Sequence, residues 1–145
     1  MTMRHTADVM VSMGAWIAAL RPDPQVSEDD VYRVQLNDPE AILGPRDVRI
    51  FPTGGRQIFP GKNLRDWETY LEVRVLYPDV QTPPEGYTVA QAAVIDAEQI
   101  SAALYDWSIV TDGIIQIRQE LATIVPDNQG IIYSTRQVRV EFTRG

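Results

Sequence analysis

The clearest pattern of hydrophobic and polar positions lies in residues 66–78, DWETYLEVRVLYP. One face would carry Trp67, Thr69, Leu71, Val73, Val75 and Tyr77, and the other would carry Glu68, Tyr70, Glu72, Arg74 and Leu76. An alternation of period two, built from β-branched and aromatic residues, is typical of a half-buried strand. Because this stretch is long for a strand, we expect it to lie centrally in a sheet.

Two segments show helical spacing instead. Residues 6–20 carry an apolar stripe of Val9, Met13, Trp16, Ile17 and Leu20, with Met10 beside it. Thr6 is a candidate N-cap, and Pro22 ends this helix. Thr88 and Gln91 form a capping box that begins a second helix, which we expect to run to about Trp107. The stripe of this second helix is Val89, Ala93, Ala97, Ile100, Leu104 and Trp107, and its alanines allow close approach to the sheet.

The last third of the chain predicts an antiparallel hairpin. Ile114–Thr123 is the first strand, with Ile115, Ile117 and Leu121 pointing inward. Residues 126–130 form a loop rich in turn residues, and Ile131–Thr143 is the second strand. Its apolar face holds Ile132, Val138, Val140 and Phe142, and its polar face holds Tyr133, Thr135, Gln137, Arg139 and Glu141. Ser134 and Arg136 fall on the apolar face, so we expect that face to be partly open near the start of the strand.

Prolines and glycines interrupt residues 21–65, for which we expect a long loop or arm. Two short strands, 31–36 and 47–52, are expected inside it. The connection 53–65 contains three basic residues, Arg56, Lys62 and Arg65, and no acid. We expect it to form an extended arm or hairpin that reaches a partner.

Together these elements predict one α+β domain spanning residues 1–145. We expect a mainly antiparallel sheet of four or five strands with two helices packed on one face. The net charge of −7 argues against binding of a nucleic-acid backbone as the main task. Since Asp8 and Ser12 interrupt the first apolar run, we interpret that run as a helix of the mature protein and not as a signal peptide. No run approaches 18 apolar residues, so we expect no membrane span.

No group of residues points to a catalytic or metal site. The chain has no cysteine and a single histidine, His5, which we interpret as a solvated residue near the terminus. The run Glu28-Asp29-Asp30 lacks the spacing of a calcium loop, and residues 127–130 are more typical of a turn. The stretch 53–56, TGGR, lacks the remainder of a phosphate-binding loop, so it is equally a flexible loop or a contact for an acidic partner. We predict no enzyme activity and no cofactor.

Glu68 and Glu72 share one strand face and alternate with Arg74, which is typical of a solvated surface. Tyr70 shares that face, and Tyr133 and Arg139 can join it from the last strand. A sheet face that mixes aromatic residues, arginines and glutamates is more typical of a protein–protein surface than of a catalytic pocket. An ordinary mixed surface is the alternative.

In order, size and acidity, the elements of this chain resemble the tail terminator proteins of long-tailed, siphophage-like bacteriophages and of gene transfer agents. The matching features are a helix (Val9–Leu20), a strand and glycine-rich loop (Val48–Lys62), the strand WETYLEVRVLYP, an alanine-rich helix (Val89–Trp107), the strand Ile114–Glu120 and the final STRQVRVEFTRG. The resemblance covers nearly the whole chain. Residues 21–45 depart from it, because they are longer and richer in proline than in the simplest members.

The resemblance implies a homo-oligomeric ring, with a hexamer as the expected form, that stacks on the last ring of tail-tube protein. Such a ring stops tube polymerisation and joins the tail to the head–tail connector of the virion, after assembly in the host cytoplasm. DNA would pass through the lumen without specific binding, and an acidic lining would repel it. The family has no catalytic residues to transfer. Interface candidates, chosen from local charge and turn content, are Arg56, Phe59, Lys62 and Arg65, together with Tyr70, Tyr133 and Arg139.

Two alternatives remain at this point. One is another neck or tail-completion protein, since those folds also combine small sheets with helices. The other, from a different class, is a small ligand-binding or enzymatic α+β domain. A ring-shaped oligomer would favour the terminator, whereas a monomer with a deep pocket would favour the ligand-binding or enzymatic domain.

Overall fold

The sheet is built around β3 (Asp66–Tyr77), the strand with the clearest alternation. The computed structural model describes residues 3–22, 31–37, 46–57, 66–77, 86–126 and 132–144. In it, β3 pairs antiparallel with β2 (Asp47–Gln57) on one side and with β6 (Ile132–Thr143) on the other. The strand order is β1–β2–β3–β6–β4, and β5 also pairs with β6. The predicted central position of this strand is therefore confirmed.

Three short strands complete the sheet. The strand β1 (Arg33–Gln35) runs parallel to β2, whereas β4 (Ile114–Gln119) and β5 (Thr123–Pro126) pair antiparallel with successive parts of β6. The sheet thus has six strands and is mixed, with one more strand than we expected. The α+β class is confirmed.

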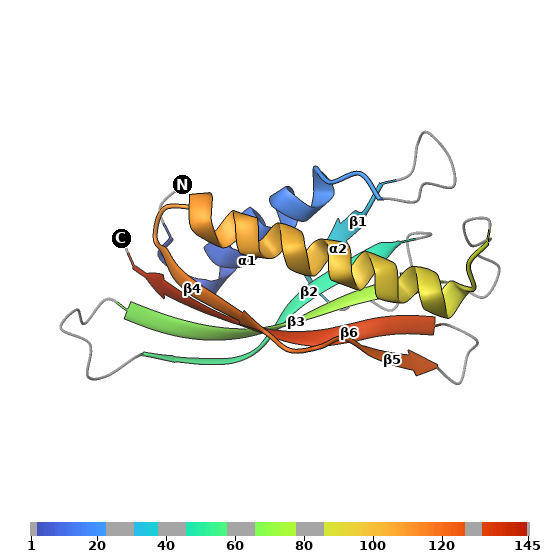
Figure 1. Ribbon diagram of the computed structural model, residues 1–145. Coiled ribbons are helices and arrows are strands. Elements are labelled where there is room, and N and C mark those ends of the chain that lie inside the picture. The colour runs from blue at the N-terminus through green and yellow to red at the C-terminus, as the bar shows by residue number, and fades with distance from the viewer. Residues whose placement is uncertain are drawn as a thin grey trace.

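Both helices, α1 (Thr6–Ala18) and α2 (Val89–Val110), lie on one face of the sheet, as Figure 1 shows. The apolar stripes predicted for them are buried, except that Trp16, Leu20 and Val89 are only partly buried against the core. Gly14 lets α1 approach β1 closely, because a Cβ at this position would lie 2.9 Å from the side chain of Leu36. Trp107 joins the helices, since its Nε1 donates a hydrogen bond to Ser12 Oγ at 3.0 Å.

The sequence predicted the N-cap of α2 correctly but the N-cap of α1 incorrectly. The capping box of α2 is confirmed: the Gln91 backbone N–H donates to Thr88 Oγ1 at 3.2 Å, and the Thr88 N–H donates to Gln91 Oε1 at 2.9 Å. The cap predicted for α1 is wrong, because Thr6 is already helical and His5 is the N-cap. Asp8 accepts hydrogen bonds from the backbone of Arg4 and His5 there, and these bonds hold the pKa of its carboxyl below its usual range.

The expected strand 114–123 is in fact two strands, and two of its three inward residues point outward. Ile117 is buried as predicted, but Ile115 is exposed and Leu121 is 94% exposed. A register shift between Ile114 and Gln116 places Ile115 outside the alternation. Leu121 lies between the end of β4 and the start of β5, where the ladder is interrupted. The break therefore leaves two large apolar side chains in solvent.

The expectation of a partly open face at Ser134 and Arg136 is also wrong. Both residues are buried under α2, whose small residues Ala93 and Ala97 leave room for them. Arg136 Nη1 donates a hydrogen bond to the backbone oxygen of Ala97 at 2.7 Å. A long polar side chain has thus been accommodated inside the helix–sheet layer.

The entry to β2 is fixed to α2 by buried polar groups. Arg46, at a positive φ of 54°, donates from Nε to Asp96 Oδ2 at 2.9 Å, and the Tyr32 hydroxyl lies 3.1 Å from Asp96 Oδ1. All three residues are almost fully buried. Because buried charges are tolerated when they are paired and hydrogen-bonded, this network fixes β1, β2 and α2 relative to one another.

The strand β2 extends further than residues 47–52. After a register shift between Pro52 and Gly54, it continues to Gln57 and pairs with the first half of β3. At Gly55 the strands are close, since a Cβ would lie 3.1 Å from the backbone oxygen of Glu68. The first part of the expected arm is therefore sheet, and the rest of it, residues 58–65, lies outside the described residues.

Candidate functional site

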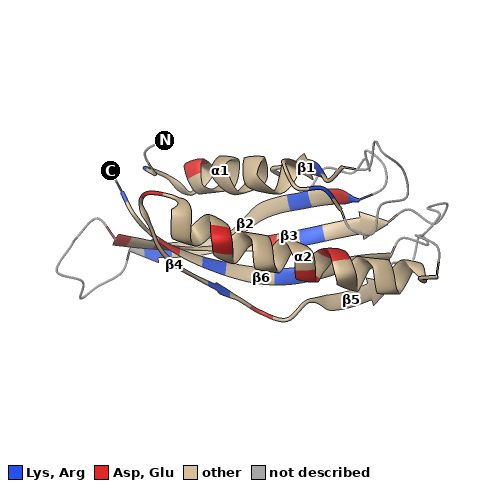
Figure 2. Ribbon diagram, turned by 45° about the horizontal axis from the view of Figure 1, so that its top comes forward, with Lys and Arg blue, Asp and Glu red and all other residues tan. Residues whose placement is uncertain are grey.

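The face of the sheet opposite the helices, which we call the open sheet face, gathers charged and aromatic side chains. Strand alternation and register place the following residues on it: Arg49, Phe51 and Arg56 of β2; Glu68, Tyr70, Glu72 and Arg74 of β3; Tyr133, Gln137, Arg139 and Glu141 of β6; and Gln116 and Arg118 of β4. Figure 2 shows arginines on the strands, whereas the charged residues of α1 and α2 are all Asp or Glu. Positive charge in this acidic chain is thus concentrated in the sheet.

Glu68 lies at the centre of one cluster on this face. Its Oε2 is 3.6 Å from Nη2 of Arg56 on β2, and its Oε1 is 3.4 Å from Nη1 of Arg139 on β6. Only 4% of the Glu68 side chain is exposed. Burial would raise its pKa, but a hydrogen bond from Tyr70 and the charges of Arg139 and Arg56 together lower the pKa below its usual range. The carboxylate therefore stays ionised and links three strands.

Arg74 organises a second cluster further along the face. It pairs with Glu72 on the same strand, and its guanidinium lies 4.9 Å from the ring centroid of Phe51 and 5.3 Å from that of Tyr133. A guanidinium at these distances is attracted by the faces of aromatic rings. Side chains from β2, β3 and β6 are again held together, which gives the face a fixed shape.

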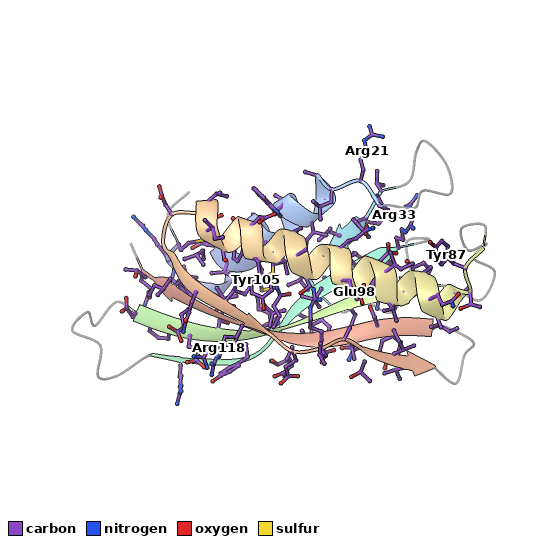
Figure 3. All side chains as sticks on the ribbon, viewed as in Figure 1. Arg21, Arg33, Tyr87, Glu98, Tyr105 and Arg118 are labelled. Atoms are coloured by element: carbon purple, nitrogen blue, oxygen red, sulfur yellow. The ribbon has the colours of Figure 1, made fainter. Side chains whose placement is uncertain are left out.

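A hollow of about 290 Å³ opens next to the first cluster. Its lining residues are Tyr70, Arg118, Gln119, Glu120, Gln137 and Arg139. Arg118 is directly opposite Arg139 in the β4–β6 register. Two like charges in this position repel each other, so an acidic group placed between them would be stabilised. Figure 3 shows the side chain of Arg118 pointing away from the sheet, on the side opposite the helices.

The sequence candidates fall into three groups. Arg56, Tyr70 and Arg139 are brought together around Glu68, while Tyr133 lies at the other cluster with Arg74. Phe59, Lys62 and Arg65 lie outside the described residues. Glu68 was expected to be solvated and is buried, with Arg56 of β2 and Arg139 of β6 as its ion-pair partners. Only strand pairing could reveal these two partners, since they lie 12 and 71 residues from Glu68 in the sequence.

Arg118 is the residue that sequence reasoning missed. It alternates with the inward Ile117, and the antiparallel pairing of this segment with the last strand was predicted correctly. The register was not predicted, and it is the register that places Arg118 opposite Arg139 on the open sheet face.

The described residues hold no group of three or more His, Asp and Glu that could bind a metal ion. His5 is exposed at the start of α1. Among the described segments, no helix is long and apolar enough to cross a membrane. The interactions that the structure does show on the open sheet face are the ion pairs of Glu68 and the contacts of Arg74 with aromatic rings.

Comparison of the chain with protein-family models and with curated proteins found no match.

Proposed function

We propose that this chain is a structural protein of a virion: a tail terminator that caps the tail tube as a ring of copies, stops tube polymerisation and joins the tail to the head connector. The observation that supports it best is the open sheet face, a wide surface of arginine, glutamate and tyrosine side chains without a helix over it. Among structural proteins of a virion, we choose the tail terminator because the chain resembles that family in element order, size and acidity.

The pairing of charges on the open sheet face favours recognition over catalysis. A general acid or base needs a proton that it can exchange with a substrate. Glu68 is instead held by two arginines, and Arg74 by Glu72 and two aromatic rings. Such prearranged Arg and Tyr side chains are the residue types that contribute most to protein–protein affinity. The surface thus suits a rigid protein partner.

The proposed partners are other copies of this chain, the tail-tube protein and the connector. DNA passes through the ring and is not bound specifically. The distribution of charge supports this arrangement, because every charged side chain on the two helices is acidic and the chain has a net charge of −7. An acidic wall repels phosphates and keeps DNA from adhering.

A tube-length experiment tests the proposal. A tail-tube protein is polymerised with increasing amounts of the wild-type chain, and tube lengths are measured by electron microscopy. We expect shorter tubes with a ring at one end. Arg118→Glu should weaken capping, because Arg118 is exposed on the open sheet face. Arg21→Glu, at another exposed arginine that follows α1, is the matched control. Tubes of unchanged length at saturating wild-type chain would contradict the proposal.

A further inference from the structure

The helix α2 has a second apolar stripe that faces away from the sheet. Its members follow helical spacing, and four of the large ones are exposed: Tyr87, just before the helix, and then Val94, Tyr105 and Ile109. Figure 3 shows Tyr87 and Tyr105 near opposite ends of the helix with Glu98 between them. A surface helix needs only one apolar stripe to pack on the core of its domain, so the outer stripe of α2 is available for another contact.

One end of this stripe is hollowed. Tyr87, Ala90, Gln91, Val94, Ile95 and Ile124 line a groove of about 400 Å³ between the first turns of α2 and the strand β5. Five of these six residues are apolar or aromatic, and the volume is within the range of sites that enclose a ligand. We call it the apolar groove. It is suited to an aliphatic side chain.

The other end of α2 carries such side chains. Ile109 is 80% exposed, Val110 is 64% exposed, and Ile115 follows at the exposed start of β4. The turn between them is tight, since the Ile114 N–H donates to the backbone oxygen of Thr111 at 3.3 Å. We call these three residues the apolar tip. Neighbouring aliphatic side chains with so much exposure on a fixed turn are unfavourable in an isolated subunit.

The tip cannot fill the groove of its own chain. Val94 and Ile109 are 15 residues apart on one continuous helix, which separates them by about 22 Å at 1.5 Å per residue. Figure 1 shows the two ends of α2 at opposite ends of the molecule. A tip that enters an apolar groove of this kind must therefore come from a second copy.

Glu98 disfavours the simplest two-fold pairing. It is exposed near the middle of α2, within the outer stripe. If two copies packed their helices antiparallel about the helix centres, the two Glu98 carboxylates would meet and repel each other. A head-to-tail contact, in which the tip of one copy enters the groove of the next, avoids this. Repeated head-to-tail contacts generate a ring when the rotation closes.

We propose that Ile109 and Val110 of each copy insert into the apolar groove of the next copy, and that this contact builds the ring. The inference rests on the proposed function, because it names the contact between neighbouring copies. It leaves the open sheet face available for the tube or the connector.

Disulfide trapping tests the contact directly, because the chain contains no cysteine that could interfere. The double variant Val94→Cys/Ile109→Cys is oxidised and run on a non-reducing gel. A bond within one chain is excluded, since bonded cysteines need Cα atoms within about 7 Å. We expect a ladder of linked copies that ends at the ring size. Val11→Cys/Ile109→Cys is the matched control, because Val11 on α1 is as exposed as Val94, at 44% against 38%, but lies outside the groove. It should give no ladder.

Single variants determine the geometry and separate the two proposals. Val94→Cys mixed with Ile109→Cys should give linked pairs and no longer species, whereas self-linked Val94→Cys would overturn the head-to-tail arrangement.

If the wild-type chain forms closed rings but the double variant gives no ladder, the docking inference fails and the ring proposal survives. If the wild-type chain forms no ring, either alone or with added tail-tube protein, and the double variant gives no ladder, both fail. A ladder without closed rings would keep the contact and contradict the terminator.

Discussion

Arg136 provides the sharpest test of how the helix–sheet layer is held together. Only 6% of it is exposed, and no carboxylate pairs with it among the described residues. Its Nη1 donates a hydrogen bond to the Ala97 carbonyl, whereas its Nε has no hydrogen-bond partner among the residues that the structure describes. Burial lowers the pKa of the guanidinium to about 10, although Tyr105 offsets part of the effect. We therefore expect the buried charge to destabilise the fold.

The magnitude follows from these observations. This fall of the pKa to about 10 corresponds to about 3 kcal/mol against the charged form. The bond to Ala97 returns about 1.5–3 kcal/mol, as is usual for a hydrogen bond from a charged group. Methionine would fill a similar volume without a charge. We therefore expect Arg136→Met to raise the free energy of unfolding by about 1 kcal/mol, in line with other replacements of buried ions by apolar residues.

Urea unfolding followed by circular dichroism measures the effect. If the free energy of unfolding rises by about 1 kcal/mol and its dependence on urea concentration is unchanged, the urea concentration at the unfolding midpoint should rise by about 0.5 M. Arg136→Ala is the control for volume, because it removes the same charge but leaves a cavity, and we expect it to lower stability by about 2–4 kcal/mol. A loss of more than about 1 kcal/mol in Arg136→Met would refute the reasoning, since it would mean that the charge itself stabilises the fold.

Two further changes test the cap of α2 and the cluster at Glu68. Thr88→Ala should cost about 1 kcal/mol in the same unfolding assay, because it removes the capping bond to Gln91, and an unchanged midpoint would contradict the role of the cap. Glu68→Gln should cost about 1 kcal/mol at pH 7, since Arg56 is largely exposed and its ion pair is screened. The folded pKa of Glu68 is lowered, so this stabilisation is present above its unfolded pKa of about 4.3 and is lost as the pH falls through the folded value. Stability curves for the wild type and Glu68→Gln should therefore converge in acid, and a constant gap down to pH 2 would show that the carboxylate charge is not responsible.

Local sequence patterns predicted the helices and strands in which one face packs consistently on the core. The strand 66–77 alternates because one of its faces packs under the helices, and the stripe of α2 repeats because it packs on the sheet. The capping box was visible because both of its partners lie within four residues. These features depend on neighbours in the sequence, so the chain alone was sufficient to predict them.

The errors occurred where distant parts of the chain meet. Arg136 is buried because alanines of α2, about 40 residues earlier, leave space above it. Leu121 is exposed because β4 and β5 pair with separate parts of β6, which turns a continuous apolar pattern into two strands and a link. Glu68 is buried because Arg56 and Arg139 come from two neighbouring strands. Strand register decides all of these outcomes, and the alternation of one strand does not specify its partners.

The candidate surface was predicted in part. Tyr70, Tyr133 and Arg139 were expected on the polar sheet face and lie there, and the structure adds Glu68 as the group that joins Arg56 to Arg139. The apolar groove and the apolar tip could not be predicted, because both depend on how α2 sits relative to β4 and β5. The sequence analysis assigned only one apolar stripe to α2, and the outer stripe was recognised from the exposure of Val94, Tyr105 and Ile109 in the structure.

The measurement that tests the central claim most directly is the solution mass of the wild-type chain, by light scattering, with negative-stain images of the same sample. The account predicts closed rings with a central hole and a mass of about six times the 16.3 kDa chain. A chain that stays monomeric at every concentration, and that added tail-tube protein does not recruit, would contradict it.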